Sequence, residues 1–153
     1  MKSELKILAT TLVLALPVNV LAVDYSAAVK VTPLLKTTTT WEGKAIVYPE
    51  GDAQLSGLMV EIAPGGETGW HEHPVPSFEL MLQGTLEVTT EHGQVKRLQA
   101  GEAFSEVVNT KHNGRNVGKE PVKILVVYIG TTDTALTIAH LEVTKSNSGN
   151  TAD

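Results

Sequence analysis

The stretch 65–84, which reads GGETGWHEHPVPSFELMLQG, constrains the fold of this chain more than any other. At its centre lie His71 and His73, two imidazoles at positions i and i+2. On an extended strand this spacing puts both side chains on the same face of a sheet. A third histidine would complete a metal site, and the best-placed partner is His112, at the edge of the strand-like run QAGEAFSEVVNTKHNGRN. The sequence therefore predicts a three-histidine metal site on a β scaffold.

The first 22 residues have the pattern of a secretory signal peptide. Lys2 and Lys6 precede an apolar run over residues 7–16, and the small residue Ala22 fits a cleavage site. The run is well short of the ~20 residues that span a bilayer, so we expect no stable membrane insertion after cleavage. The protein is expected to be periplasmic or secreted, with a mature chain that begins near Val23.

Composition limits the mature chain to one domain and to a narrow set of partners. Cleavage after residue 22 leaves 131 residues, enough for one core, and takes the net charge from −5 to −6. We expect a single barrel domain over residues 23–142 and a disordered tail over residues 143–153. The net charge is negative and the chain has no cluster of Lys or Arg, which argues against a nucleic-acid partner. Because the chain has no cysteine, a metal site must use histidine, carboxylate or water.

Along the mature chain, short strand-like runs alternate with turns rich in Gly and Pro. Turns at Gln83–Gly84 and His92–Gly93 divide one long stretch into two or three strands. A further turn at Glu42–Gly43 leads into a strand that ends at Pro49. Residues 121–130, PVKILVVYIG, are typical of a central strand.

Helical periodicity is absent from the mature chain, apart from a short helical turn that we expect near 134–140. Many short strands with tight turns indicate an all-β sandwich or closed barrel.

Two motifs carry a family resemblance. Gly65, followed by five residues, His71-x-His73 and later Gly84, resembles the first motif of the cupin superfamily. The inter-motif segment has the short length seen in small bacterial cupins. The resemblance implies a double-stranded β-helix, a jelly-roll barrel that holds a divalent metal inside.

The second motif is similar to its cupin counterpart but departs from it at two positions. Gly101, ten residues, His112, three residues and Asn116 follow the pattern, whereas Val107 and Asn109 stand where the family usually has Pro and Gly. Asn tolerates left-handed backbone angles nearly as well as Gly, so the turn at position 109 should be preserved. The resemblance implies that the two histidines of the first motif and His112 bind the metal.

The fourth ligand is the larger departure. Seven residues before Gly84, the usual glutamate of the first motif is Ser77, and the nearest carboxylate is Glu79. Since strand side chains repeat every two residues, Glu79 shares a face with Ser77 but is displaced by about 6.6 Å along the strand. Three roles are open for it: direct metal ligand, ligand through water, or catalytic base. Beside a divalent cation its carboxylate should stay ionised.

Several metals and functions fit this ligand set. Imidazole suits Fe, Mn, Zn, Ni and Cu, so the identity of the divalent metal is undetermined. The favoured function is a small metal-dependent oxidoreductase, oxygenase-like, acting on a small organic molecule, because an acidic group lies inside the barrel beside three ligands. The alternatives are a non-catalytic exported cupin that binds a small ligand or the metal, and a metal-dependent isomerase or lyase.

The strand that carries Glu79 also predicts self-association. If Glu79 faces the interior, then Phe78, Leu80 and Leu82 face outward and need a cover. The cover is either the N-terminal strands of the same chain or a second subunit. We expect a homodimer, because two-fold dimers are the usual oligomer.

Overall fold

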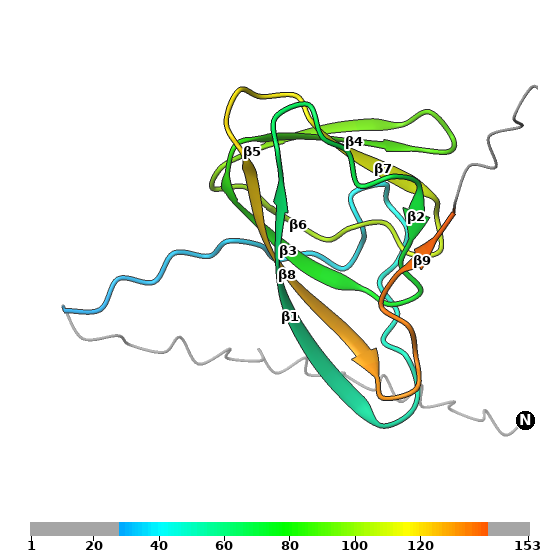
Figure 1. Ribbon diagram of the computed structural model, residues 1–153. Helices are drawn as coiled ribbons and strands as arrows, with labels where there is room; N and C mark the ends of the chain where they lie inside the picture. Colours follow the sequence, from blue (N-terminus) through cyan, green and yellow to red (C-terminus); the bar gives the residue numbers. More distant parts are fainter. Residues whose placement is uncertain (1–27, 141–153) are drawn as a thin grey trace, which may run out of the picture. The chain divides into compact units, whose positions relative to one another are not determined.

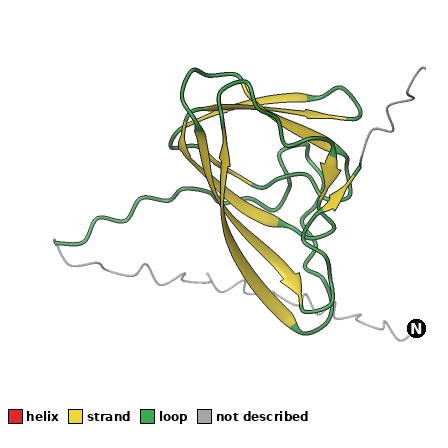
Figure 2. Cartoon of the chain, viewed as in Figure 1, coloured by secondary structure: helices red, strands yellow, loops and turns green. Residues whose placement is uncertain are grey.

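The computed structural model describes residues 28–140. The predicted signal peptide and the predicted tail therefore lie outside the described residues. Residues 28–32 hold no strand or helix, and every described strand belongs to the part of the chain that follows. Figure 2 shows that the described chain consists of strands and loops. Between residues 28 and 140, no helix is long and apolar enough to cross a membrane.

The strands form two antiparallel sheets. They are β1 (Ala53–Ile62), β2 (His71–Glu72), β3 (Ser77–Gln83), β4 (Thr85–Thr90), β5 (Val95–Gln99), β6 (Ala103–Phe104), β7 (His112–Asn116), β8 (Val122–Thr131) and β9 (Ile138–Ala139). One sheet has the order β1-β8-β3-β6 and the other β5-β4-β7-β2-β9. Figure 1 shows β1, β8 and β3 crossing one side of the barrel, with β4, β5 and β7 on the other. This arrangement confirms the expected all-β jelly-roll fold.

The core lies between the two sheets and follows the two-residue period of the strands. In β8, the side chains of Ile124, Val126 and Tyr128 are buried, and the residues between them are half-buried. In β4, which belongs to the opposite sheet, the side chains of Leu86 and Val88 are buried. Because strand side chains alternate between faces, each sheet contributes one apolar face to a shared interior.

Two turns require residues that tolerate a positive φ. Gly84 joins β3 to β4 with a φ of 83°, and a Cβ there would lie 2.8 Å from the carbonyl oxygen of Pro121. Only glycine fits both constraints. Asn109 adopts a φ of 51°, which confirms that Asn can replace the usual Gly of the second motif.

Two local expectations were wrong. The residues after Glu42 do not form a strand; Thr39 and Ala45 make an isolated bridge around a turn. The helical turn expected near 134–140 is absent from the described chain, because that segment forms β9, which pairs with β2. At residues 138–139 pairing with the distant β2 overrides the local helical preference, whereas the bridge between Thr39 and Ala45 is a local contact.

Candidate metal centre

Strand pairing brings the three predicted histidines together. β2 pairs with β7 so that His71 lies directly opposite His112. His73 follows β2, and its carbonyl oxygen accepts a hydrogen bond from the backbone N–H of Asn109 at 2.9 Å. The left-handed turn at Asn109 therefore ties the loop before β7 to the segment after β2. The two motifs, far apart in sequence, meet at one end of the barrel interior.

The three imidazoles form a compact cluster. One ring nitrogen of each of His71, His73 and His112 can be chosen so that all three lie within 4.8 Å of one another. Ring centroids are 4.3 to 5.0 Å apart. Among residues 28–140 this is a group that can hold a metal ion, and Glu79 is not a member of it.

Each imidazole is held in one orientation by a backbone carbonyl. The Nδ1–carbonyl pairs are His71 with Gly69 at 2.8 Å, His73 with Leu136 at 2.9 Å and His112 with Thr110 at 2.9 Å. A carbonyl only accepts, so each Nδ1 carries the proton and each Nε2 keeps a free lone pair. Metal-binding histidines characteristically donate their second ring N–H in this way. The donor set therefore fits a divalent ion held by three Nε2 atoms.

Burial keeps the three imidazoles neutral, which is the form that binds metal. Desolvation, together with the nearby His112, lowers the pKa of His73 to about 3. Desolvation also lowers the pKa values of His71 and His112, against the opposing effect of their carbonyl hydrogen bonds. Neutral imidazole offers its lone pair without first losing a proton.

The histidine cluster borders two pockets. The inner cavity has a volume of about 60 Å³ and is lined by the histidines, apolar core residues and two carboxylates, Glu79 and Glu106. The outer pocket has a volume of about 660 Å³ and reaches His71 and His73 from the side of Trp70. A molecule can therefore approach the histidines from the outer pocket, with the carboxylates on the inner side.

Glu79 points into the barrel, as its strand position implied. It is 5% exposed, and its Oε1 accepts a hydrogen bond from the hydroxyl of Ser77 at 3.2 Å. Desolvation raises its pKa well above the usual value, and the neighbouring carboxylate of Glu106 raises it further. The expectation that Glu79 stays ionised therefore depends on a cation to offset its burial. Direct metal ligation by Glu79 stays a prediction of the sequence.

Glu106 is a functional candidate that the sequence reasoning missed. It is 4% exposed, and its Oε1 accepts hydrogen bonds from the indole N–H of Trp41 at 2.5 Å and the backbone N–H of Val107 at 2.8 Å. Burial raises its pKa, and these two hydrogen bonds oppose that shift. Its position, six residues before His112 in the second motif, was the available signal. We call Glu79 and Glu106 the carboxylate pair.

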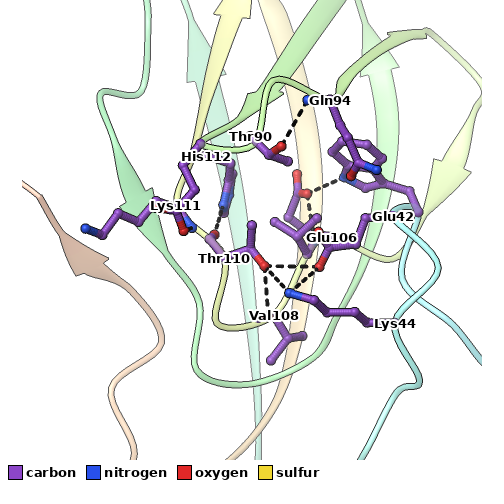
Figure 3. Close-up of polar contacts among 12 residues, drawn as sticks. Glu42, Lys44, Thr90, Gln94, Glu106, Val108, Thr110, Lys111 and His112 are labelled. Carbon is purple, nitrogen blue, oxygen red and sulfur yellow. Dashed lines mark hydrogen bonds and ion pairs between the residues drawn. The ribbon is translucent and has the colours of Figure 1, made fainter.

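A polar network of Glu42, Lys44 and Thr110 supports the orientation of His112 (Figure 3). Lys44 donates to the hydroxyl of Thr110 at 2.6 Å and forms an ion pair with Glu42 at 3.0 Å. The Thr110 hydroxyl donates to Glu42 at 3.1 Å. The carbonyl of Thr110 is the acceptor for His112 Nδ1, so this network positions an imidazole of the candidate metal site.

Tyr128 is the second residue that the sequence reasoning missed. It lines both pockets, and its hydroxyl lies 3.5 Å from Nε2 of His73. Desolvation raises its pKa to about 12, with a further contribution from Glu79. It is therefore a neutral hydrogen-bond donor beside the metal-binding nitrogens. Its place in β8, opposite Ser77 in register, puts its side chain inside the barrel.

Of the other polar residues singled out by the sequence, one anchors a loop, one lies in a turn and one lines a pocket. Asn116 anchors a loop: its amide donates to the carbonyls of Ile62 at 2.9 Å and Glu120 at 2.8 Å. His92 is exposed in the turn that the sequence predicts at His92–Gly93. His140 lines the outer pocket, and its Nε2 lies 3.6 Å from a carboxylate oxygen of Glu72.

Comparisons with known proteins agree with this fold. The family model described as Cupin domain matches residues 58–128. Oxalate decarboxylase of Lactobacillus farciminis, in a formate complex, has a TM-score of 0.50 at 27% identity, covering 56% of this chain and 26% of that one. The DMSP lyase DddQ of Ruegeria pomeroyi DSS-3 has a TM-score of 0.49 at 25% identity, with coverages of 56% and 42%.

A Bacillus subtilis oxalate decarboxylase described with Mn(II) centres has a TM-score of 0.48 at 21% identity, covering 56% of this chain and 23% of that one. The chain thus spans less than half the length of each of these structures. No curated protein matches it.

Proposed function

We propose that this chain, which matches the Cupin domain model over residues 58–128, is a metal-dependent enzyme, an oxygenase-like oxidoreductase that acts on a small organic molecule. The observation that carries the proposal is the carboxylate pair, which lines the same cavity as the three Nε2 atoms. Buried carboxylates are costly unless they are used or paired, and they concentrate at catalytic sites.

The division of roles follows from the contacts. His71, His73 and His112 bind the metal through Nε2. When bound, a divalent metal supplies a Lewis acid and, for a redox-active ion, an electron-transfer partner for O₂. The identity of the ion is part of the test.

The carboxylate pair handles protons. Ser77 and Trp41 each hold one carboxylate by its Oε1 atom, so the second oxygen of each carboxylate is the one available to a ligand. Because burial raises both pKa values, the pair holds and releases protons nearer to neutral pH than exposed glutamates do. Tyr128, still protonated at neutral pH, donates a hydrogen bond to a ligand oxygen beside His73.

The test measures metal content and then oxygen consumption. Purified protein is analysed for metals, and O₂ uptake is followed over a panel of small phenols, acids and thiols. Stoichiometric redox-active metal with uptake of O₂ for one panel member supports the proposal. Zinc without any turnover contradicts it and favours a non-catalytic binding protein. Turnover without O₂ uptake contradicts the oxygenase assignment and favours a lyase or isomerase.

We further propose that the protein is a homodimer that buries the outer face of β1. The N-terminal segment covers part of the sheet, since Leu35 and Tyr48 line a groove with Phe78 and Ile129. That cover does not extend over β1, where Leu55 is 73% exposed and Met59 is 54% exposed. Adjacent exposed apolar side chains on an edge strand favour association with a second copy.

Replacement of Met59 by Asp should therefore produce a monomer. A charge at this exposed position costs the folded subunit little, whereas it would be desolvated in the dimer. Light scattering at micromolar concentration should give a dimer mass for the wild-type protein and half that mass for the variant. Val95→Asp is the matched control, because Val95 is 57% exposed on the opposite sheet. A monomeric wild-type protein would refute the proposal.

A further inference from the structure

The inner cavity and the outer pocket form one continuous binding site. Both are lined by Val60, Thr68, His71, His73 and Tyr128. The inner cavity, at about 60 Å³, has room only for small groups. The outer pocket, at about 660 Å³, is large enough for a ring. A ligand that reaches the histidines therefore places its polar end inward and its body outward.

The charges in this site oppose an anionic ligand. Among the residues that the structure describes, no Lys or Arg lines either pocket, while Glu79 and Glu106 line the inner cavity and Glu67 the outer pocket. The carboxylate pair can already balance the two positive charges of a divalent ion. A dicarboxylate would add uncompensated negative charge in a partly desolvated site, where charges interact more strongly than in water.

The outer pocket has an apolar part that favours an apolar body, although Glu67, Asn113 and His140 also line the pocket. Leu58, Val60, Trp70 and Ala139 line it, together with the ring of Tyr128. These side chains offer contact area and dispersion to a ring, and they offer no ionic partner to a charged group. The polar end of the ligand meets Tyr128, the histidines and the carboxylate pair.

From this lining we propose that the substrate is an uncharged small molecule with an apolar body and acidic hydroxyl groups, such as a phenol or an enediol, and that dicarboxylates are rejected. The inference rests on the proposed function, because it concerns the ligand of the same site. On binding, the O–H bond of the ligand breaks, its proton forms an O–H bond with a carboxylate of the pair, and the ligand oxygen keeps the electron pair. Total charge in the site is unchanged. A dianion brings no proton with it and so leaves the charge unbalanced.

The test compares catechol with oxalate, which both present two oxygens on adjacent carbons but differ in charge. Binding to the metal-loaded protein is measured by calorimetry, with the fluorescence of Trp41 and Trp70 as a second readout. Each affinity is divided by the affinity of the same ligand for the free ion, so that the contribution of the protein is isolated. We expect this ratio to be at least about tenfold higher for catechol, given the strength of charge interactions at such sites. An equal or higher ratio for oxalate, or no binding of catechol, overturns the inference.

A double variant, Glu79→Gln with Glu106→Gln, tests the physical cause. It removes the negative charge and the proton acceptors while preserving side-chain size, so oxalate should gain about tenfold or more and catechol should lose a similar factor. The matched control is Glu61→Gln with Glu87→Gln, two carboxylates that form ion pairs with Lys123 and Arg97 outside both pockets. An identical change in the control would show that net charge alone is responsible, which refutes the assignment to the pair.

Failure of the proposed function can be distinguished from failure of the proposed substrate class. A protein that takes up no metal overturns the proposed function before either ligand is added. A protein that binds metal but prefers oxalate contradicts only the substrate class. If the double variant does not fold, the comparison of the two ligands on the wild-type protein decides by itself.

Discussion

Replacing His112 with Ala should abolish metal binding at micromolar metal and leave the barrel folded. Loss of a hydrogen-bonding partner of a ligand already lowers metal affinity by roughly 10–100-fold, so loss of the ligand itself should exceed that range. His112 is the member of the cluster that faces His71 across the β2–β7 pairing, so its removal breaks the three-nitrogen set. Metal content by elemental analysis, before and after dialysis against a weak chelator, measures the effect.

The fold should survive because the core stabilises it independently of the ion. Met81, Val88, Leu98 and Val122 are each no more than 1% exposed, and none of them depends on the histidines for its packing partners in the two sheets. We expect the unfolding free energy of the metal-free variant to fall by about 1–3 kcal/mol, within the range of ordinary buried substitutions. Circular dichroism and thermal unfolding test this.

His92→Ala is the matched control for the metal measurement, since His92 is exposed in a turn. Retention of full metal content in the His112 variant would contradict the three-histidine site. Unfolding of the variant at room temperature would show instead that the ion is needed for folding, and His73→Ala, which removes a ligand outside the strands, would then be compared.

The second large effect concerns turnover. Glu106→Gln and Glu79→Gln should each lower kcat by roughly the 10²–10⁴ that is typical of general acid–base groups. Gln preserves the size of each side chain and its hydrogen bonds but removes the acidic proton and the basic oxygen. Metal content should drop far less than in a histidine variant, because the three Nε2 atoms are untouched. Steady-state kinetics and elemental analysis on the same preparation separate the two effects.

Trp41→Phe refines the assignment of Glu106. The indole N–H donates to Oε1 of Glu106, so its loss removes one of two donors that position this carboxylate and oppose the rise in its pKa. The pH profile of kcat should shift to higher pH in this variant, because the loss of a donor to the charged form raises the pKa. Glu87→Gln, which alters a carboxylate outside the pockets, should leave both kcat and the pH profile unchanged. Wild-type turnover in both single Gln variants would refute a proton role for the carboxylate pair.

Local sequence pattern was sufficient for much of the scaffold and for the choice of three histidines that the structure clusters. A two-residue period and glycine turns predicted β3, β4, β5 and β8, since strand geometry is a short-range property. The i, i+2 spacing placed His71 and His73 together for the same reason. Asn109 could be assigned a left-handed backbone, because its side chain is one of the few that tolerate it.

The tertiary structure alone decided what surrounds the three imidazoles. Glu106 is held by Trp41, 65 residues away, and Lys44 reaches Thr110 across 66 residues. No local periodicity encodes such contacts, because they depend on how the N-terminal turn packs against the loop before β7. The same holds for Tyr128. Side-chain alternation along the strand predicts only that Tyr128 faces inward, and the register opposite Ser77 places it beside His73. The sequence by itself thus determined a β-barrel with three clustered histidines and an inward-facing Glu79, whereas long-range packing placed Glu106 and the hydroxyl of Tyr128 beside them.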